Sequence, residues 1–169
     1  MAPSDVFLGL GSNLGDREWA LGEGVRALAR RGFRVTSRSS VYHTQPVGGP
    51  PQGWFLNAVI CGKTTLDPET LLSECLGVER ELGRVRSVRS GPRILDIDLL
   101  LYGGEIRHSA ALTLPHPRLH QRLFVLVPLA EIAPGARHPL LGLTAEQMRE
   151  RCSDPSEVVV FHSASVAEG

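Results

Sequence analysis

Two aspartates, Asp96 and Asp98, stand one residue apart inside an apolar run that reads Ile-Leu-Asp-Ile-Asp-Leu-Leu-Leu-Tyr. Alternate side chains of a β-strand share a face, so both carboxylates would project from one side, with α-carbons about 6.5 Å apart. Carboxylates at this separation repel each other, and aspartate also disfavours strands. A hard cation such as Mg²⁺ would offset both costs, because it binds carboxylates together with water and phosphate oxygens. The alternative is a solvated face of an edge strand.

A concentrated positive segment precedes this run. Residues 84–93 contain four arginines and no acidic residue, in a chain whose 18 basic and 18 acidic residues cancel. The four are Arg84, Arg86, Arg89 and Arg93. Guanidinium groups match phosphate oxygens, and together with a carboxylate-bound cation they would suit Mg²⁺-nucleotide chemistry. The alternatives are a solvated basic loop and a nucleic-acid-binding patch.

Two other motifs suggest different chemistry. The glycines of Gly9-Leu-Gly-Ser-Asn-Leu-Gly15 are spaced as in a dinucleotide-binding turn, which favours an oxidoreductase as an alternative. Residues 34–40, however, contain no acidic residue that could bind a ribose. His116 and His120 are spaced like a zinc pair, but prolines on both sides of His116 disfavour the helix that such a pair needs.

The elements that must position these residues follow from hydrophobic spacing and turn signals. The spacing predicts strands at 6–10, 33–42, 55–64 and 94–102, and helices at 16–31 and 67–82. A loop at 45–53, a short strand near 105–107, a helix at 124–132 and a last strand at 158–162 complete the pattern. The order β-α-β-β-α-β predicts an α+β, ferredoxin-like sandwich, with an antiparallel sheet, helices on one face and C-terminal additions.

The length of 169 residues predicts a single domain over 1–169, with about 150–169 as a tail or an edge strand. No apolar run is long enough to cross a membrane, and the start of the chain lacks a signal-peptide pattern. Three widely spaced cysteines suit a reducing cytoplasm. Zero net charge argues against binding nucleic acid or membranes through the whole surface. We therefore expect a cytoplasmic protein. We also predict that its partners are small molecules and that it is a monomer or weak homodimer.

The segment Arg89-Ser-Gly-Pro-Arg-Ile-Leu-Asp-Ile-Asp-Leu-Leu100 closely resembles the signature of the 6-hydroxymethyl-7,8-dihydropterin pyrophosphokinase family. The opening LGLGSNLGDR, the stretches at 55–58 and 83–86, and LTLPHPRLHQRLFVLVPLAEIAP resemble the rest of that family, in order, from about residue 6 to residue 135. The resemblance implies a ferredoxin-like fold. It also implies transfer of the β,γ-pyrophosphate of ATP to the hydroxymethyl group of the dihydropterin, releasing AMP, in folate biosynthesis.

The resemblance also implies roles for individual residues. Asp96 and Asp98 would hold two Mg²⁺ ions, and Arg84 and Arg93 would stabilise charge on the transferring group. Contacts with ATP would come from Glu79, Arg86, Arg89, His116 and Arg122. The pterin would lie between Phe55 and Phe124, with Asn57 and the backbone near Thr44 and Val47 at its edges. Departures from the pattern that bear on nucleotide affinity occur at Leu76, Ser90, Ala111 and Pro117. An RNA-binding ferredoxin-like module and a dinucleotide-binding oxidoreductase are the alternative functions.

Overall fold

The structure is a computed structural model that describes residues 4–47, 51–83 and 94–162. Within these residues it contains eight strands, four α-helices and one 3-10 helix. The strands are β1 (Val6–Ser12), β2 (Arg34–Arg38), β3 (Tyr42–Thr44), β4 (Phe55–Lys63), β5 (Asp96–Tyr102), β6 (Arg107–His108), β7 (Thr113–Leu114) and β8 (Val158–Val160). The helices are α1 (Arg17–Arg30), α2 (Pro68–Glu81), α3 (Leu123–Ile132) and α4 (Ala145–Arg151), with the 3-10 helix η1 at Leu119–Gln121.

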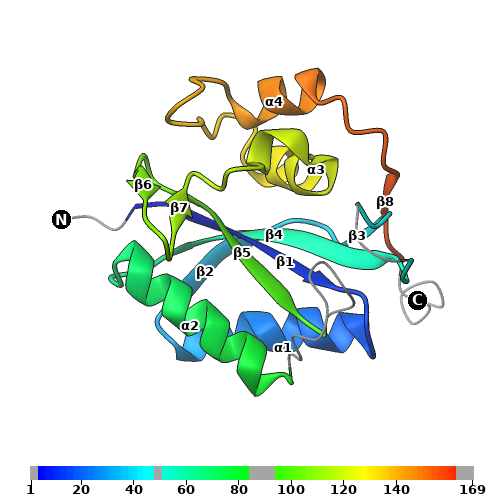
Figure 1. The fold of residues 1–169 in the computed structure, drawn as a ribbon. Helices are drawn as coiled ribbons and strands as arrows, with labels where there is room; N and C mark the ends of the chain where they lie inside the picture. Colours follow the sequence, from blue (N-terminus) through cyan, green and yellow to red (C-terminus); the bar gives the residue numbers. More distant parts are fainter. Residues whose placement is uncertain (1–3, 48–50, 84–93, 163–169) are drawn as a thin grey trace.

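The main sheet is antiparallel and runs in the order β5-β1-β4-β3-β8, with β2 also paired to β4 (Figure 1). Strand β5, which carries the two aspartates, therefore lies at one edge, and β8 lies at the other. Strands β6 and β7 form a separate small hairpin. The predicted α+β class with an antiparallel sheet is confirmed, and the predicted last strand is present as β8.

Helices cover both faces of the sheet. Helices α1 and α2 share one face, as predicted, whereas α3 and α4 lie over the other (Figure 1). Alternate residues of β1 serve the two sides: Leu8 belongs to the core beneath α1 and α2, and Phe7 belongs to the core beneath α3 and α4. A sheet covered on both sides explains why its central strands read as continuous apolar runs. None of the helices in the described ranges has the length and apolar content needed to span a membrane.

The helix boundaries follow the signals in the sequence. Asp16 and Asp67 are the N-caps of α1 and α2, each accepting a hydrogen bond from a backbone N–H one turn later, and Pro68 occupies the first turn of α2. Helix α4 was not predicted, although its start carries a capping box in which Thr144 and Gln147 bind each other's backbone N–H. The capping-box pattern in the sequence could have predicted the start of α4.

The prediction of one strand over 33–42 was wrong, because the structure breaks it into β2 and β3. Ser39 lies at the break, where its N–H donates to the Val59 carbonyl and its hydroxyl accepts from the Val59 N–H. The next residue, Ser40, donates from its backbone N–H and its hydroxyl to the carboxylate of Glu131 on α3. Tyr42 donates to the same carboxylate at 2.7 Å. A tertiary contact with α3 therefore redirects the chain between the two strands.

We expect Glu131→Ala to lower the free energy of unfolding by about 1–2 kcal/mol at pH 7, because Ser40 and Tyr42 lose a charged acceptor. Burial alone would raise the pKa of Glu131, but the hydrogen bonds from Tyr42 and Ser40 outweigh it and hold the pKa below the ordinary 4.5. The stabilisation is therefore complete above the unfolded-state pKa and is lost as pH falls through the lower folded-state pKa. Urea denaturation at pH 7 and at about pH 3 measures this. A difference between wild type and variant that stays constant with pH would contradict it.

Candidate active site

A cavity of about 500 Å³ lies between the sheet and the start of α3. Its lining comes from β1, β3, β4 and β5, from residues 45–47 and 52, and from η1 and α3. The volume and the mixture of apolar and polar lining residues are typical of a small-molecule site. The cavity thus lies where strands distant in the sequence come together.

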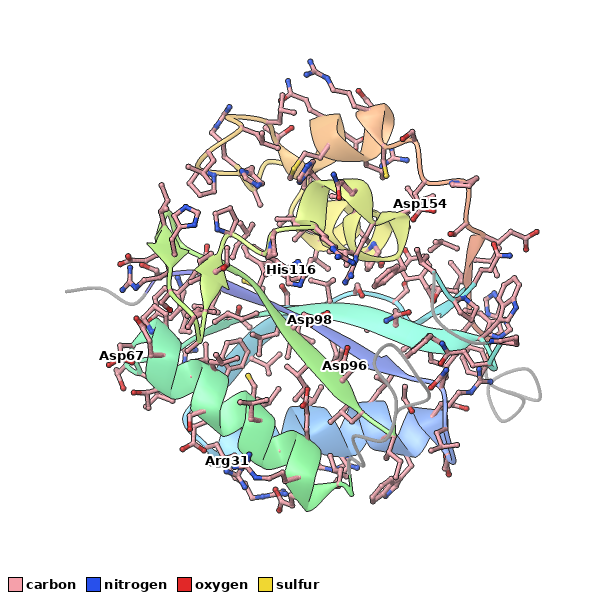
Figure 2. The ribbon with its side chains drawn as sticks, viewed as in Figure 1. Arg31, Asp67, Asp96, Asp98, His116 and Asp154 are labelled. Atoms are coloured by element: carbon pink, nitrogen blue, oxygen red, sulfur yellow. The ribbon has the colours of Figure 1, made fainter. Side chains whose placement is uncertain are left out.

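Asp96 and Asp98 both line this cavity. They project from the same side of β5, as the alternation predicted, while Ile97 between them is buried in the core beneath α1 and α2 (Figure 2). Within the described residues, no group of three or more His, Cys, Asp or Glu side chains could hold a metal ion. A cation at these two carboxylates would therefore complete its shell with phosphate oxygens and water, which is how Mg²⁺ usually binds.

Gly9 and Gly11 form a floor without side chains beside the aspartates, and we call this pair the glycine floor. In the register of β1 and β5, Gly9 lies opposite Asp98 and Gly11 lies opposite Asp96. On the other side of β1, Gly11 lies opposite Asn57 of β4. Both glycines are inside a strand that continues to Ser12, so they are not the strand-to-helix turn that holds a dinucleotide.

The part of the cavity away from the aspartates contains the residues that the family resemblance assigned to the pterin. Thr44, Val47, Phe55, Asn57 and Phe124 all line it. The Asn57 amide is oriented by two hydrogen bonds: its Nδ2 donates to the Leu10 carbonyl at 3.4 Å, and its Oδ1 accepts from the Thr44 hydroxyl at 2.5 Å. A carbonyl can only accept, so Nδ2 must face Leu10 and Oδ1 must face Thr44. Asn57 thus presents a defined donor and acceptor pattern.

His116 lies next to Asp98, with its Nε2 4.0 Å from Oδ1 of that carboxylate, although it is not among the residues that line the cavity (Figure 2). Its backbone N–H donates to the Leu100 carbonyl, and its Nδ1 accepts from the Arg118 N–H at 3.1 Å. Burial, and to a smaller extent the charges of Arg122 and Arg118, together lower the pKa of His116 to about 4. The imidazole is therefore neutral at pH 7 with its proton on Nε2, so it can donate a hydrogen bond but carries no charge.

Arg122 lines the cavity, and its guanidinium lies over the Phe124 ring, 5.6 Å from the centroid. Glu79 is placed differently: it is buried, and its carboxylate accepts from the Ile97 N–H at 2.7 Å. It is not among the residues that line the cavity. Its predicted contact with ATP therefore stays a prediction. The predicted roles of Arg84, Arg86, Arg89 and Arg93 fall outside the described residues.

Among the lining residues that sequence reasoning did not assign to the site are Gln52, Arg118 and Gln121. Arg118 and Gln121 belong to the same segment as His116 and Arg122, so their position beside these two residues could have indicated a place in the site. Gln52 lies in the proline- and glycine-rich loop, where no pattern marked a single residue.

Comparison with known proteins identifies the family. The model of the 7,8-dihydro-6-hydroxymethylpterin-pyrophosphokinase family matches residues 7–134. The chain belongs to this family. It is 47% identical over 156 residues to 2-amino-4-hydroxy-6-hydroxymethyldihydropteridine pyrophosphokinase of Methylorubrum extorquens, covering 90% of this chain and 96% of that protein. It is 48% identical over 128 residues to the protein of the same name from Bacillus subtilis, covering 75% of this chain and 77% of the relative.

The fold is shared with longer proteins. The crystal structure of wild-type Plasmodium falciparum HPPK-DHPS with pteroate superposes with a TM-score of 0.71 at 13% identity, covering 88% of this chain and 44% of that one. The prediction of an ATP-dependent pyrophosphokinase is confirmed by the family match and by the Methylorubrum extorquens and Bacillus subtilis relatives. These matches do not favour the two alternative functions, an RNA-binding module and a dinucleotide-binding oxidoreductase.

Gly11→Ala tests whether a pyrophosphokinase of this sequence needs the glycine floor. A Cβ at Gly11 would lie 2.5 Å from Nδ2 of Asn57, so the amide would have to move. Loss of one directed hydrogen bond costs about 1–2 kcal/mol, so the dissociation constant for dihydropterin should rise about tenfold in a fluorescence titration. Gly9→Ala is the matched control, because the nearest atom to its Cβ, on Leu100, would lie at 3.5 Å, an ordinary contact distance. Equal effects of the two variants on pterin binding would contradict the argument.

Proposed function

We propose that this cavity holds both substrates of the family reaction, with ATP at the carboxylate end and 6-hydroxymethyl-7,8-dihydropterin at the Asn57 end. The reaction moves the terminal pyrophosphate of ATP to the hydroxymethyl oxygen and releases AMP. The observation that carries the proposal is the row of neighbouring positions Asp96, Gly11 and Asn57 on three adjacent strands. A carboxylate that can bind a metal ion and an amide that can hydrogen-bond the edge of a pterin therefore line the same cavity, with only a glycine between them.

The pterin end suits a flat ring with polar edges. Phe55 and Phe124 line the cavity from β4 and from α3, and stacking between two aromatic rings is how proteins hold flat heterocycles. Asn57 would read one polar edge through its fixed amide. The backbone at Thr44 and Val47, on the same side of the cavity, would bind another part of that edge.

The carboxylate end suits the triphosphate. The donor set of Asp96 and Asp98 fits Mg²⁺, and the proposal includes two ions, which would neutralise phosphate charge and hold the phosphates in line. His116 would donate from Nε2, and Arg122 would supply positive charge from the start of α3. Arg84, Arg86, Arg89 and Arg93 are proposed to bind the phosphates, and Glu79 to contact ATP. No general base is obvious among these residues, and phosphoryl transfer can proceed mainly through positioning and charge stabilisation.

The proposal also covers the arrangement of the fold, the domain organisation and the oligomeric state. The order β5-β1-β4-β3 supports the ferredoxin-like split β-α-β arrangement, with α3, α4 and β8 as additions. We propose a single domain over residues 1–169 that works in the cytoplasm, as a monomer or weak homodimer, without nucleic acid or membrane as a partner.

A product assay tests the proposal. Purified protein is incubated with ATP, Mg²⁺ and 6-hydroxymethyl-7,8-dihydropterin, and the nucleotides are separated by chromatography. One AMP should appear for each dihydropterin consumed. Appearance of ADP would identify a simple kinase and overturn the reaction. Omission of Mg²⁺ should abolish turnover, and turnover that persists with a chelator would overturn the metal assignment.

A further inference from the structure

Two residues that follow β1 bind the backbone just before Phe55. Asn13 donates from Nδ2 to Oε1 of Gln52 at 2.7 Å and to the carbonyl of Gly53 at 3.0 Å. Arg17 donates from Nη1 to the carbonyl of Trp54 at 2.9 Å. Three consecutive residues, 52–54, are thus bound by one short segment almost 40 positions earlier in the chain.

Arg17 occupies a position that its own helix disfavours. It is the first residue of α1, directly after the N-cap Asp16, where the helix dipole repels a positive charge. The bond to Trp54 offsets this local conflict. A residue that disfavours its own secondary structure is usually kept because of a tertiary contact or a function, and such residues often lie at functional sites.

The residues held in this way lead directly into the cavity. Gln52 lines it, and Phe55, the first residue of β4, follows Trp54 without a spacer. The Trp54 ring also lies against His43 of β3, with centroids 4.9 Å apart. Because the carbonyls of Gly53 and Trp54 are both bound, the backbone that enters Phe55 has a fixed direction.

We propose that Asn13 and Arg17 are positioning residues for the pterin end of the cavity, which act by holding residues 52–54 so that Gln52 and Phe55 face the substrate. This inference rests on the proposed function, because it assumes that the pterin lies against Phe55. Asn13 lies near the end of the glycine motif Gly9–Gly15, so the proposal gives that part of the motif a function in the present site.

Binding experiments test the proposal with Asn13→Ala and Arg17→Met, which remove the donors. Each variant should raise the dissociation constant for dihydropterin by about tenfold or more, because Arg17→Met removes one hydrogen bond that orders the loop and Asn13→Ala removes two, while the constant for ATP stays unchanged. Arg26→Met is the matched control, since Arg26 is on the same helix and pairs with Glu23 on the surface. Should Arg17→Met fail to fold, Arg17→Lys keeps the charge with a shorter reach and should weaken pterin binding to a smaller degree.

A second readout does not depend on substrate. In a Trp19→Phe background the fluorescence comes from Trp54 alone, because the chain has two tryptophans. Arg17→Met should make Trp54 more accessible to acrylamide quenching, and Arg26→Met should not. The pKa of His43 is lowered by burial first and by the charge of Arg17 second, so Arg17→Met should also raise it in an NMR titration.

The outcomes separate the inference from the proposed function. Weaker pterin binding together with greater quenching of Trp54 supports the inference. Unchanged pterin binding in Asn13→Ala and Arg17→Met overturns it, whether or not Trp54 becomes more accessible, provided that Phe55→Ala does weaken pterin binding. If Phe55→Ala also leaves pterin binding unchanged, the proposed pterin site itself is wrong and the inference fails with it. A thermal midpoint that falls in both variants without a selective loss of pterin affinity would show a merely structural role and overturn the inference.

Discussion

Asp96→Asn and Asp98→Asn should each lower kcat by about a thousandfold or more while the protein stays folded. Each substitution removes one negative ligand, and metal-bound charge stabilisation in such sites is worth several kcal/mol, of which about 4 kcal/mol corresponds to a thousandfold. Because the two carboxylates are proposed to act on the same phosphates, the double variant should be little worse than either single variant.

The stability of the same variants is expected to move in the opposite direction. Two like charges on adjacent positions of one strand face repel each other, so removing one should leave the thermal midpoint unchanged or raise it. AMP release measures the first effect and thermal denaturation without ligands measures the second. Asp5→Asn is a suitable control, because Asp5 pairs with Lys63 and does not line the cavity. Normal kcat in either variant, or unfolding of both, would show that the carboxylates have a structural task instead.

Phe55→Ala and Phe124→Ala should each raise the dissociation constant for dihydropterin by about 10- to 100-fold. Stacking of a flat heterocycle on an aromatic ring is worth about 1–3 kcal/mol, which corresponds to that range. Both rings line the cavity and neither belongs to the fully buried core, so the cost to folding should be small. Calorimetric titration with dihydropterin measures the affinity, and the same titration with an ATP analogue is the internal control.

The two phenylalanine variants also test the direction of substrate binding. If the dissociation constant for the ATP analogue rises as much as that for dihydropterin, the rings contact the nucleotide and the two ends of the proposed cavity must be exchanged. Phe124→Leu refines the result, because leucine keeps apolar contact without a ring face. It should retain part of the affinity if burial contributes, and lose as much as alanine if stacking dominates.

Local rules predicted the parts of the molecule that depend on neighbouring residues. The alternation along β5 placed Asp96 and Asp98 on one side, and the caps at Asp16 and Asp67 set the starts of α1 and α2. The break between β2 and β3 could not be predicted in this way, since it depends on Glu131, 91 residues from Ser40 in sequence. The residue types at 39 and 40 suit a strand as well as a turn, and only packing of α3 decides between them.

In the candidate site, too, some residues could be placed from the sequence and others depended on long-range contacts. Thr44, Phe55, Asn57 and Phe124 meet at one cavity as the family resemblance implied, because they are carried by adjacent strands and by α3. Glu79 was assigned to the nucleotide, yet its carboxylate binds the backbone N–H of Ile97. Helical spacing shows which face a residue occupies but not which backbone group of a neighbouring strand it will meet. Hydrogen bonds such as those of Asn13 and Arg17 across to residues 52–54 are equally invisible to sequence patterns.

The glycine floor has a consequence for distance. Asp96, Gly11 and Asn57 occupy neighbouring positions on three adjacent strands, so the separation between the two ends of the cavity equals two strand spacings, about 10 Å. Backbone hydrogen bonding sets that length, and side-chain rotamers or loop conformations cannot change it. The sheet therefore fixes the distance between the strand positions that carry the proposed contacts with ATP and with the pterin. Changes in the surrounding loops can alter how tightly each substrate is held, but this backbone distance stays the same.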